Sequence, residues 1–338
     1  MISSLMSALG RGAAVLAMGT VFASPALAQK IIKVDGSSTV YPITEAVAEE
    51  FQGKNPGVKV TVGISGTGGG FKKFTRGETD ISDASRPISK GEIEECKKNG
   101  IEYIELPIAF DALTVVINKQ NSWAKNMTVE ELKKLWEPDA QGKITKWNQI
   151  NPAWPDAKIE LYGAGTDSGT FEYFTEAIVG KAKASRGDYT ASEDDNTLVK
   201  GVEGSKNALG YFGMSYYLAH QDKLAAVHVA WDKNKATKEP VAPTKEHVID
   251  GSYAPLSRPL FIYVNKKSVE TKPEVKKFVD FYLASAKELT TEVKYVPLPD
   301  AAYDSIKSRF AKLQTGTVFG GEAAVGMKIE DILSREAK

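Results

Sequence analysis

Two apolar stretches decide the fold: ALTVVINK, from Ala112 to Lys119, and RPLFIYVNK, from Arg258 to Lys266. Both have the composition of buried strands and both end in Asn-Lys, although 146 positions separate their first residues. That separation is too long for a short structural repeat. Two unrelated buried strands would give the same pattern. The alternative is a pair of crossover strands, in which the chain leaves a first domain near Phe110, builds a second, and returns near Pro259.

The segments around these strands alternate between strand-like and helix-like composition. IIKVDG (31–36) and VKVTVGISG (58–66) read as strands, and each is followed by a turn rich in glycine or serine and an amphipathic segment. Strands alternating with helices indicate an α/β protein with parallel sheet. Later in the chain, Thr128 and Glu131 in TVEELKKLW have the spacing of a helix capping box. We therefore expect two α/β lobes joined by two hinge strands, with a ligand cleft between them.

The composition indicates which binding partners to expect, and the N-terminal residues indicate the cellular compartment of the protein. The chain has 43 basic and 43 acidic side chains, so its overall charge favours neither nucleic acid nor an anionic membrane surface. Near the N-terminus, an apolar run over 13–23 precedes Ala26-Leu27-Ala28, an A-x-A cleavage pattern. The run is shorter than the ~20 apolar residues of a membrane span. A buried helix is the alternative, but the triplet favours a secretory signal peptide over 1–28, cleaved after Ala28. Cys96 is the only cysteine, so no internal disulfide is expected.

Four stretches combine glycine or proline with Ser or Thr where a strand ends. They are GSSTVYP (36–42), SGTGGGF (65–71), DASRP (83–87) and GTDSGTF (165–171). Helix N-termini expose unpaired backbone N–H groups, and glycine lets an anion approach them closely. Any one stretch alone is more simply an N-cap. Three helix-opening turns and one arginine-bearing loop together can converge on a single oxyanion.

Other kinds of site find little support in the sequence. SGTGGGFKKF lacks the spacing of a P-loop, and no G-x-G-x-x-G with a downstream acid is present. The histidines, His220, His228 and His247, do not have the spacing of zinc ligands. Ser168 lacks the G-x-S-x-G elbow of a hydrolase nucleophile, although a triad can assemble from distant residues. We therefore expect no catalytic residue, no metal site and no cofactor.

With these stretches in view, the chain resembles the periplasmic phosphate-binding proteins of Pst-type ABC importers. The resemblance covers nearly the whole chain after the signal peptide. It is closest to the branch with the motifs GTDSGTF, SEDDN (192–196), NALGYFG (207–213) and PLSRPLFIY (255–263). It implies a type II periplasmic-binding fold that closes on one dehydrated phosphate. The expected lobes are 29–110 with 260–338, and 111–259.

The resemblance also implies the ligand contacts. The family's first binding loop corresponds to Ser38, Thr39 and Val40. Its second loop places a hydroxyl on Thr67, with Ser65 as the near alternative. Its Ser-Gly-Thr turn corresponds to the residues Ser168, Gly169 and Thr170.

Two positions depart from the family pattern. Known members have an aspartate where this chain has Ser85, followed here by Arg86, and an arginine where this chain has Ala164. We infer that Arg86 supplies the guanidinium, whose fork suits a tetrahedral oxyanion. In the alternative, Arg86 pairs with a surface acid such as Asp83.

A carboxylate must then accept the proton of the bound phosphate. The candidates are Asp167, Asp194 and Asp195. Such an acceptor would repel sulfate, which has no proton to donate at neutral pH. For Asp194 and Asp195, the alternative is a helix N-cap with acids in the first turn.

The prediction is a monomeric periplasmic protein that binds inorganic phosphate and delivers it to ABC transporter permease subunits. One alternative is the same scaffold tuned to sulfate, molybdate or tungstate. A second is a secreted phosphatase that uses Ser168. A third, an extracellular adhesion or signalling role, is neither supported nor excluded by the sequence.

Overall fold

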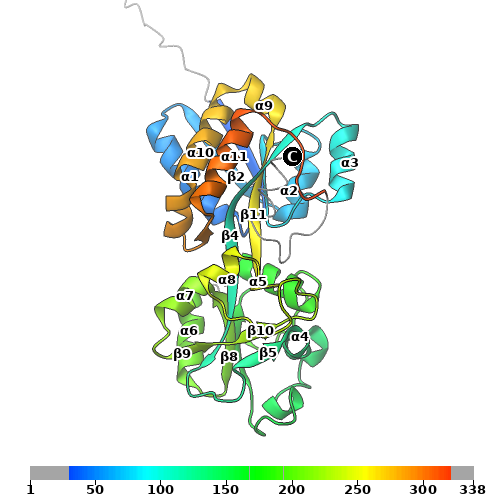
Figure 1. Cartoon of the computed structure of the whole chain (residues 1–338), viewed down its shortest axis with the longest axis vertical. Helices are drawn as coiled ribbons and strands as arrows, with labels where there is room; N and C mark the ends of the chain where they lie inside the picture. The colour runs from blue at the N-terminus through cyan, green and yellow to red at the C-terminus, as the bar shows by residue number, and fades with distance from the viewer. Residues whose placement is uncertain (1–29, 167, 193, 321–338) are drawn as a thin grey trace, which may run out of the picture.

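The computed structural model describes residues 30–166, 168–192 and 194–320, so the predicted signal peptide lies outside the described residues. The described chain forms two halves (Figure 1). The upper half contains β1 (Lys30–Gly36), α1 (Tyr41–Lys54), β2 (Val58–Ile64), α2 (Gly66–Phe74), β3 (Ile81–Ala84), α3 (Lys90–Lys98), α9 (Lys266–Thr271), α10 (Pro273–Glu292) and α11 (Asp300–Ala311).

The lower half is built from the middle of the chain (Figure 1). It contains β5 (Asn126–Thr128), α4 (Val129–Trp136), β6 (Glu160–Ala164), α5 (Gly169–Phe174), β7 (Thr190–Ser192), α6 (Asp195–Gly204), β8 (Ala208–Gly213), α7 (Met214–Ala219), β9 (Leu224–Ala226), β10 (His228–Ala230) and α8 (Lys245–Ile249). The 3₁₀ turns η1 (Pro138–Ala140) and η2 (Trp147–Gln149) follow α4, and a π-helical turn, η3 (Thr175–Val179), continues α5.

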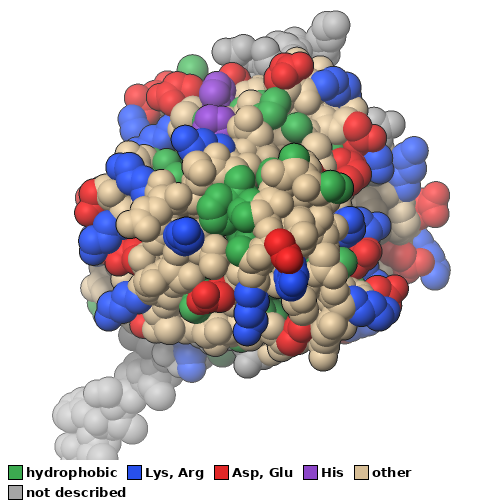
Figure 2. Space-filling model, turned by 90° about the horizontal axis from the view of Figure 1, so that it is seen from below, with side chains coloured by type: hydrophobic (Ala, Val, Ile, Leu, Met, Phe, Trp, Pro, Cys, Tyr) green, Lys and Arg blue, Asp and Glu red, His purple; other side chains and the backbone are tan. Residues whose placement is uncertain are grey.

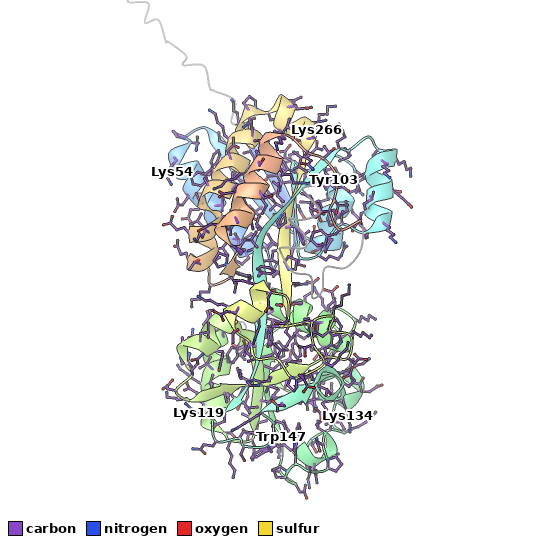
Figure 3. All side chains as sticks on the ribbon, viewed as in Figure 1. Lys54, Tyr103, Lys119, Lys134, Trp147 and Lys266 are labelled. Atoms are coloured by element: carbon purple, nitrogen blue, oxygen red, sulfur yellow. The ribbon has the colours of Figure 1, made fainter. Side chains whose placement is uncertain are left out.

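Two long strands, β4 (Tyr103–Asn118) and β11 (Ser257–Asn265), join the halves (Figure 1). In Figure 3, Tyr103 at the start of β4 lies in the upper half, and Lys119, just after its end, lies in the lower half. β4 pairs antiparallel with β11 up to Ala112 and with β8 from Leu113 onward. Every residue of both strands is buried, which explains their mainly apolar composition, and the charged exceptions include Asp111 and Arg258. The predicted lobe boundaries fall inside these strands, and the division into lobes stays a prediction.

The sheet order brings the ends of several parallel strands to the region between the halves. The order is β2-β1-β3-β11-β4-β8-β6-β7, and the short β12 (Val296–Pro297) pairs with β4. β1 is parallel to β2 and β3, and β6 is parallel to β7 and β8, so the predicted α/β class with parallel strands is confirmed. Ligands of open α/β sheets bind outside the carboxyl ends of such strands. The four glycine- or serine-bearing stretches begin at the ends of β1, β2, β3 and β6.

One continuous hydrophobic core runs through both halves along β4 and β11. In the upper half, Phe51 of α1 packs edge-to-face on Phe278 of α10, with ring centroids 5.2 Å apart. In the lower half, the Trp136 ring lies edge-on to Phe174 and Tyr211, whose own rings stack at 3.7 Å. These aromatic contacts fix α4 and α5 against the sheet.

Local signals in the sequence also appear in the structure. The Thr128 hydroxyl accepts a hydrogen bond from Glu131 N at 3.0 Å, so the predicted capping box is confirmed. Cys96 is a buried free thiol. No helix in the described ranges is both long and apolar enough to cross a membrane. On the end face of the lower half, basic and acidic side chains are interspersed (Figure 2).

Candidate anion-binding site

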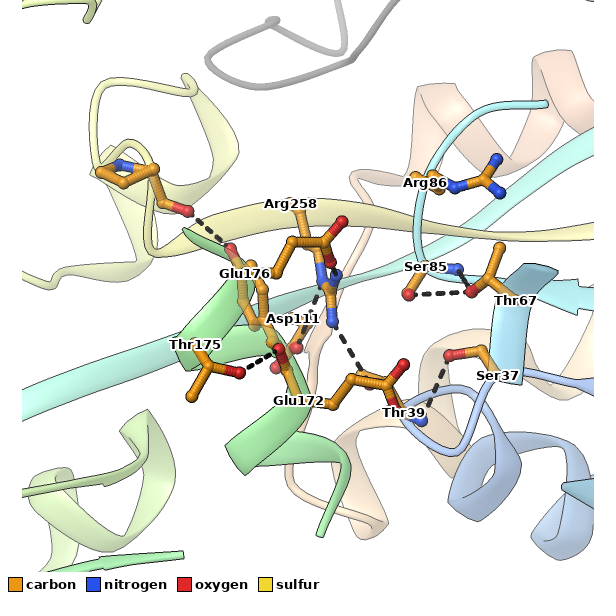
Figure 4. Close-up of polar contacts among 12 residues, drawn as sticks. Ser37, Thr39, Thr67, Ser85, Arg86, Asp111, Glu172, Thr175, Glu176 and Arg258 are labelled. Atoms are coloured by element: carbon orange, nitrogen blue, oxygen red, sulfur yellow. Dashed lines mark hydrogen bonds and ion pairs between the residues drawn. The ribbon is translucent and has the colours of Figure 1, made fainter. Parts of the chain in front are cut away.

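A cavity of about 320 Å³ lies between the two halves, where the predicted loops meet. Its walls come from the turn after β1, the start of α2, the loop after β3, the helix α5 with η3, and the strand β11. The lining residues are Ser37, Thr39, Ser65, Gly66, Thr67, Gly68, Gly69, Ser85, Arg86, Glu172, Glu176, Ala182 and Arg258. Figure 4 shows most of the polar side chains among them, with Arg258 near the centre.

The turn after β1 contributes Ser37 and Thr39. Gly36 has φ 152°, and a Cβ there would lie 2.1 Å from the backbone oxygen of Asp83, so the chain can turn here only at glycine. The Ser37 hydroxyl accepts a hydrogen bond from Thr39 N at 3.2 Å. Of the residues predicted in this loop, Thr39 lines the cavity and Ser38 is half-buried, whereas the Val40 side chain is fully buried in the core. Ser37 was not predicted, although it stands in the same stretch.

The start of α2 contributes Thr67, which contacts Ser85. Thr67 Oγ1 accepts a hydrogen bond from Ser85 N at 3.1 Å and lies 3.0 Å from Ser85 Oγ. Because only one hydroxyl proton can lie between the two oxygens, the other proton is available to a ligand. The Ser65 hydroxyl donates instead to Asp35, which also pairs with Lys73 at 2.6 Å. Thr67 is thus better placed than Ser65 to donate into the cavity.

The Ser-Gly-Thr turn at the start of α5 faces the first turn across the two halves. A Cβ on Gly169 would lie 3.0 Å from both the backbone nitrogen and Oγ1 of Thr39, and 3.1 Å from Ser38 Oγ. Ser168 caps the helix, and its hydroxyl accepts from Thr170 N at 3.1 Å. Thr170 lines a second cavity, and the residues that line the anion cavity include neither it nor Ser168 or Gly169. Asp167 lies outside the described residues.

Arg258 is the main residue that the sequence analysis missed. Its side chain is 9% exposed and lies where β11 crosses between the halves. One Nη donates to Thr39 Oγ1 at 3.3 Å and the other to Glu176 Oε2 at 3.4 Å. Its guanidinium carbon lies 3.5 Å from the centroid of the Tyr173 ring. Arg258 is the single charge in PLSRPLFIY, and a charge in a buried strand needs partners or a ligand, which was the available signal.

Asp111 lies directly opposite Arg258 in the β4–β11 register. The distance from its Oδ2 to Arg258 Nε is 3.7 Å, and both side chains are about nine-tenths buried. Burial raises the pKa of Asp111 to about 6, against the opposing effect of the Arg258 guanidinium. The pair places a buried charge of each sign on the two strands that join the halves.

Arg86 lines the cavity, but its fork is engaged by another acid. Nη1 and Nη2 donate to the two carboxylate oxygens of Glu92 at 2.9 and 2.8 Å. Burial of Glu92 opposes ionisation, but the hydrogen bonds from Arg86 and Ser89 still hold its pKa below the usual value. The alternative, in which Arg86 pairs with an acid, holds for Glu92 but not for the example Asp83, which is 1% exposed inside the upper half. The guanidinium of Arg86 is therefore already oriented by Glu92 before an anion enters the cavity.

Asp194 and Asp195 are not among the described residues that line the cavity, and Asp167 lies outside the described residues. Asp194 is exposed and caps α6, where Asn196 N donates to it at 2.9 Å and lowers its pKa. Asp195 lies in the second cavity, with Thr170 and Asp111. Glu172 and Glu176 line the anion cavity itself. The sequence contained a signal for these two glutamates. They follow Ser168 at intervals of four positions, and residues four apart lie on the same face of a helix.

The described residues offer little for metal or nucleophilic chemistry at this place. They contain no cluster of three or more His, Cys, Asp or Glu side chains that could hold a metal ion. None of the three histidines is among the residues that line the cavity. The site can thus supply hydroxyl donors, backbone amides and two guanidiniums, balanced by two glutamates.

Comparison with known proteins agrees with this architecture. Residues 23–286 match the model of the PBP superfamily domain. The chain is 50% identical to protein SphX of Synechocystis sp. over 335 residues, which is 98% of each chain. It is 39% identical to the phosphate-binding protein PstS of Staphylococcus saprophyticus over 280 residues, covering 82% of this chain and 83% of that one. The crystal structure of a possible phosphate binding protein from Planctomyces limnophilus is 51% identical, with a TM-score of 0.80, covering 85% of this chain and 99% of that one.

These matches and the sheet topology define a substrate-binding protein with the type II periplasmic-binding fold. Within that class, the chain belongs to the family of PstS-type phosphate-binding proteins.

Proposed function

We propose that this protein captures inorganic phosphate between its two halves and delivers it to a membrane ABC transporter. The observation that carries the proposal is the contact between Arg258, on a joining strand, and Thr39, at a cavity lined by residues of both halves. Gly169 of the lower half approaches the same threonine closely. The names of the PstS relative and of the structure from Planctomyces limnophilus point to the same ligand.

In the proposed mode of binding, protein donors replace the hydration shell of the ion. Thr39, Thr67 and the amides of the turns at Ser38 and Ser168 donate hydrogen bonds, and Arg258 supplies the buried positive charge. Hydrogen bonds to an ionised acceptor are about twice as strong as neutral ones, especially where water is excluded. Arg86 adds a second guanidinium at the edge of the cavity, held in place by Glu92.

We infer that Glu172 and Glu176 distinguish phosphate from sulfate. Two guanidiniums and two glutamates leave the cavity without a net formal charge, so an anion must be recognised by its hydrogen bonds. A carboxylate can accept the proton of monohydrogen phosphate but repels sulfate, which has none to give at neutral pH. The sequence assigned this role to Asp167, Asp194 or Asp195. Asp167 lies outside the described residues, and the cavity lining favours the two glutamates over Asp194 and Asp195.

The remaining expectations belong to this proposal. Residues 1–28 would act as a signal peptide cleaved after Ala28, and the monomeric protein would work in the periplasm, where permease subunits receive the ligand. A phosphatase is disfavoured because Ser168 Oγ is engaged by Thr170 N and none of the lining residues is a histidine that could serve as its base.

Competition calorimetry tests the proposal. Phosphate should bind to the purified chain, and equimolar sulfate or molybdate should leave the phosphate isotherm nearly unchanged. Displacement of phosphate by sulfate at equal concentration would favour another oxyanion. Turnover of a chromogenic phosphoester that is lost in Ser168→Ala would favour the phosphatase.

A further inference from the structure

A third cavity, with a volume of about 490 Å³, adjoins the anion cavity. The two share Ser85, Arg86, Glu176 and Arg258, so they lie on either side of, or meet at, these side chains. We call the larger cavity the annex. Its volume lies within the range of about 300–1,000 Å³ that is typical of sites for small organic molecules. An inorganic phosphate ion held by Thr39, Thr67 and Arg258 would leave the annex unused.

The annex has mainly apolar walls. The side chains of Val129, Ile178, Val179, Trp231, Pro255 and Pro259 line it. Trp231 is half-buried, and Pro255 and Pro259 are buried at either side of Arg258. Sites for organic ligands combine such walls with a few polar groups that fix orientation. Here, Arg86, Glu176 and Arg258 supply polar groups where the annex adjoins the anion cavity.

The π-helical turn η3 gives the annex its shape. Helices of this kind are rare and frequently occur at functional sites. Within η3, Glu176 reaches Arg258 at the junction of the two cavities, while Ala177, Ile178 and Val179 line the annex. The same turn thus contributes an anion-facing acid and an apolar wall.

Three exposed or partly exposed charged side chains also line the annex, and two of them are basic. Lys133 and Lys233 are exposed there, accompanied by Glu130. An organic substituent that is apolar next to its phosphoryl group therefore matches the walls of the annex. The exposed lysines can accommodate a polar or anionic group on that substituent. Arg258 can contact the phosphoryl oxygens with its Nη atoms, since these already point to Thr39 and Glu176.

We propose that this protein also binds organic phosphoryl compounds, namely phosphonates or phosphate monoesters with a compact apolar or aromatic substituent. The phosphoryl group occupies the anion cavity and the substituent occupies the annex. This inference rests on the proposed function, because the phosphoryl group uses the same donors as inorganic phosphate.

The test compares phosphate, methylphosphonate and phenylphosphonate by calorimetry on the full mature chain. Phenylphosphonate should compete with phosphate and bind more tightly than methylphosphonate, by about tenfold, because only its ring fills the annex. Ala177→Trp places a large side chain in the annex and should weaken phenylphosphonate binding by about tenfold while leaving phosphate binding within about threefold. Trp231→Ala removes a wall and should also weaken phenylphosphonate selectively.

Phosphate serves as the internal control for folding in every variant. If phosphate binds and neither phosphonate displaces it, the annex proposal is wrong and the proposed function stands. If phenylphosphonate binds but neither annex substitution changes its affinity, the annex is not its site and the proposal is also wrong. If phosphate itself does not bind to the wild-type chain, the proposed function fails first, and this inference fails with it.

Discussion

Arg258 and Thr39 are 219 positions apart in the sequence, yet the arginine donates to the threonine hydroxyl at 3.3 Å. The contact joins the crossover strand β11 to the turn that follows the first strand of the fold. On its other side, Arg258 lies against Asp111 and the ring of Tyr173. A guanidinium with this many directed contacts is positioned before any ligand arrives, which reduces the entropy lost on binding.

Replacement of Arg258 by Gln should weaken phosphate binding strongly. Truncation of a buried, hydrogen-bonded charge typically costs 2–5 kcal/mol, so we expect a loss of about 30-fold or more, measured by calorimetry. Arg76→Gln is the matched control, because Arg76 is exposed and pairs only with its neighbour Glu78. Unchanged phosphate affinity with a lowered melting temperature would mean that Arg258 only stabilises the packing of β4 against β11.

Replacement of Arg86 by Ala should also weaken phosphate binding, by about tenfold or more. Glu92→Gln should have a smaller effect, since it loosens the guanidinium without removing it. Calorimetry on both variants separates the two contributions. If Arg86→Ala binds phosphate like the wild type, Arg86 is not a ligand and its pairing with Glu92 is purely structural.

The glutamates of the cavity should control selectivity more than affinity. In Glu176→Gln and Glu172→Gln, loss of a carboxylate removes both an acceptor for the phosphate proton and a repulsion against sulfate. We expect the ratio of phosphate to sulfate affinity to fall by about tenfold in at least one variant, measured by competition calorimetry near pH 7. Glu288→Gln, on the exposed face of α10, is the control. An unchanged ratio in both cavity variants would show that neither glutamate accepts the phosphate proton, and would favour one of the three aspartates considered in the sequence.

Much of the fold can be read from the sequence because its signals are local or continuous. β4 and β11 are buried at every position, so long parts of their sequences are apolar, and this composition indicated the two strands although it did not exclude that they were unrelated. The capping box of Thr128 and Glu131 depends on residues only three positions apart. The extent of β4 was harder to predict, because its partner changes at Leu113 without any change in composition.

Only part of the site could be predicted, because several of its contacts join residues that are far apart in the sequence. Hydroxyls in the turns after strands belong to short motifs that the sequence shows, and the family resemblance then assigned Thr39, Thr67 and the position of Ser85. Arg258 was passed over because its partners, Thr39 and Glu176, lie far away in the sequence. The engagement of Arg86 by Glu92 depends on how α3 packs beside the loop after β3, which a motif does not specify.

Asp83 should make stability fall as the pH rises. Burial raises its pKa from 3.8 to about 8, and the nearby Thr44 hydroxyl only partly offsets this. Neither carboxylate oxygen meets a hydrogen-bonding partner within the part of the chain that the structure describes. The folded state holds this proton more tightly than the unfolded state. Stability from Asp83 is therefore full below about pH 4, and is lost as the pH rises to about 8.

Asp83→Asn cannot ionise, so the variant should gain stability relative to the wild type as the pH rises. Urea unfolding at about pH 5 and about pH 8 should show a difference that grows by at least about 1 kcal/mol. Asp304→Asn, an exposed position on α11, should follow the wild type at both values. A difference that is independent of pH would show that Asp83 is already ionised in the folded protein.

Gly169→Ala should impair binding by separating the two turns that meet at the cavity. The added methyl group would lie 3.0 Å from Thr39 N and Thr39 Oγ1, closer than nearly all Cβ contacts, so one turn must shift by a few tenths of an ångström. Because the donors come from both halves, even such a shift lengthens hydrogen bonds to a bound ion, and we expect a loss of about tenfold in phosphate affinity. Gly91→Ala in α3 is the matched control, since a Cβ there meets nothing within 4 Å. Equal affinity in the two variants would mean that the halves do not need to approach at Gly169, and that phosphate is held by the upper half and Arg258 alone.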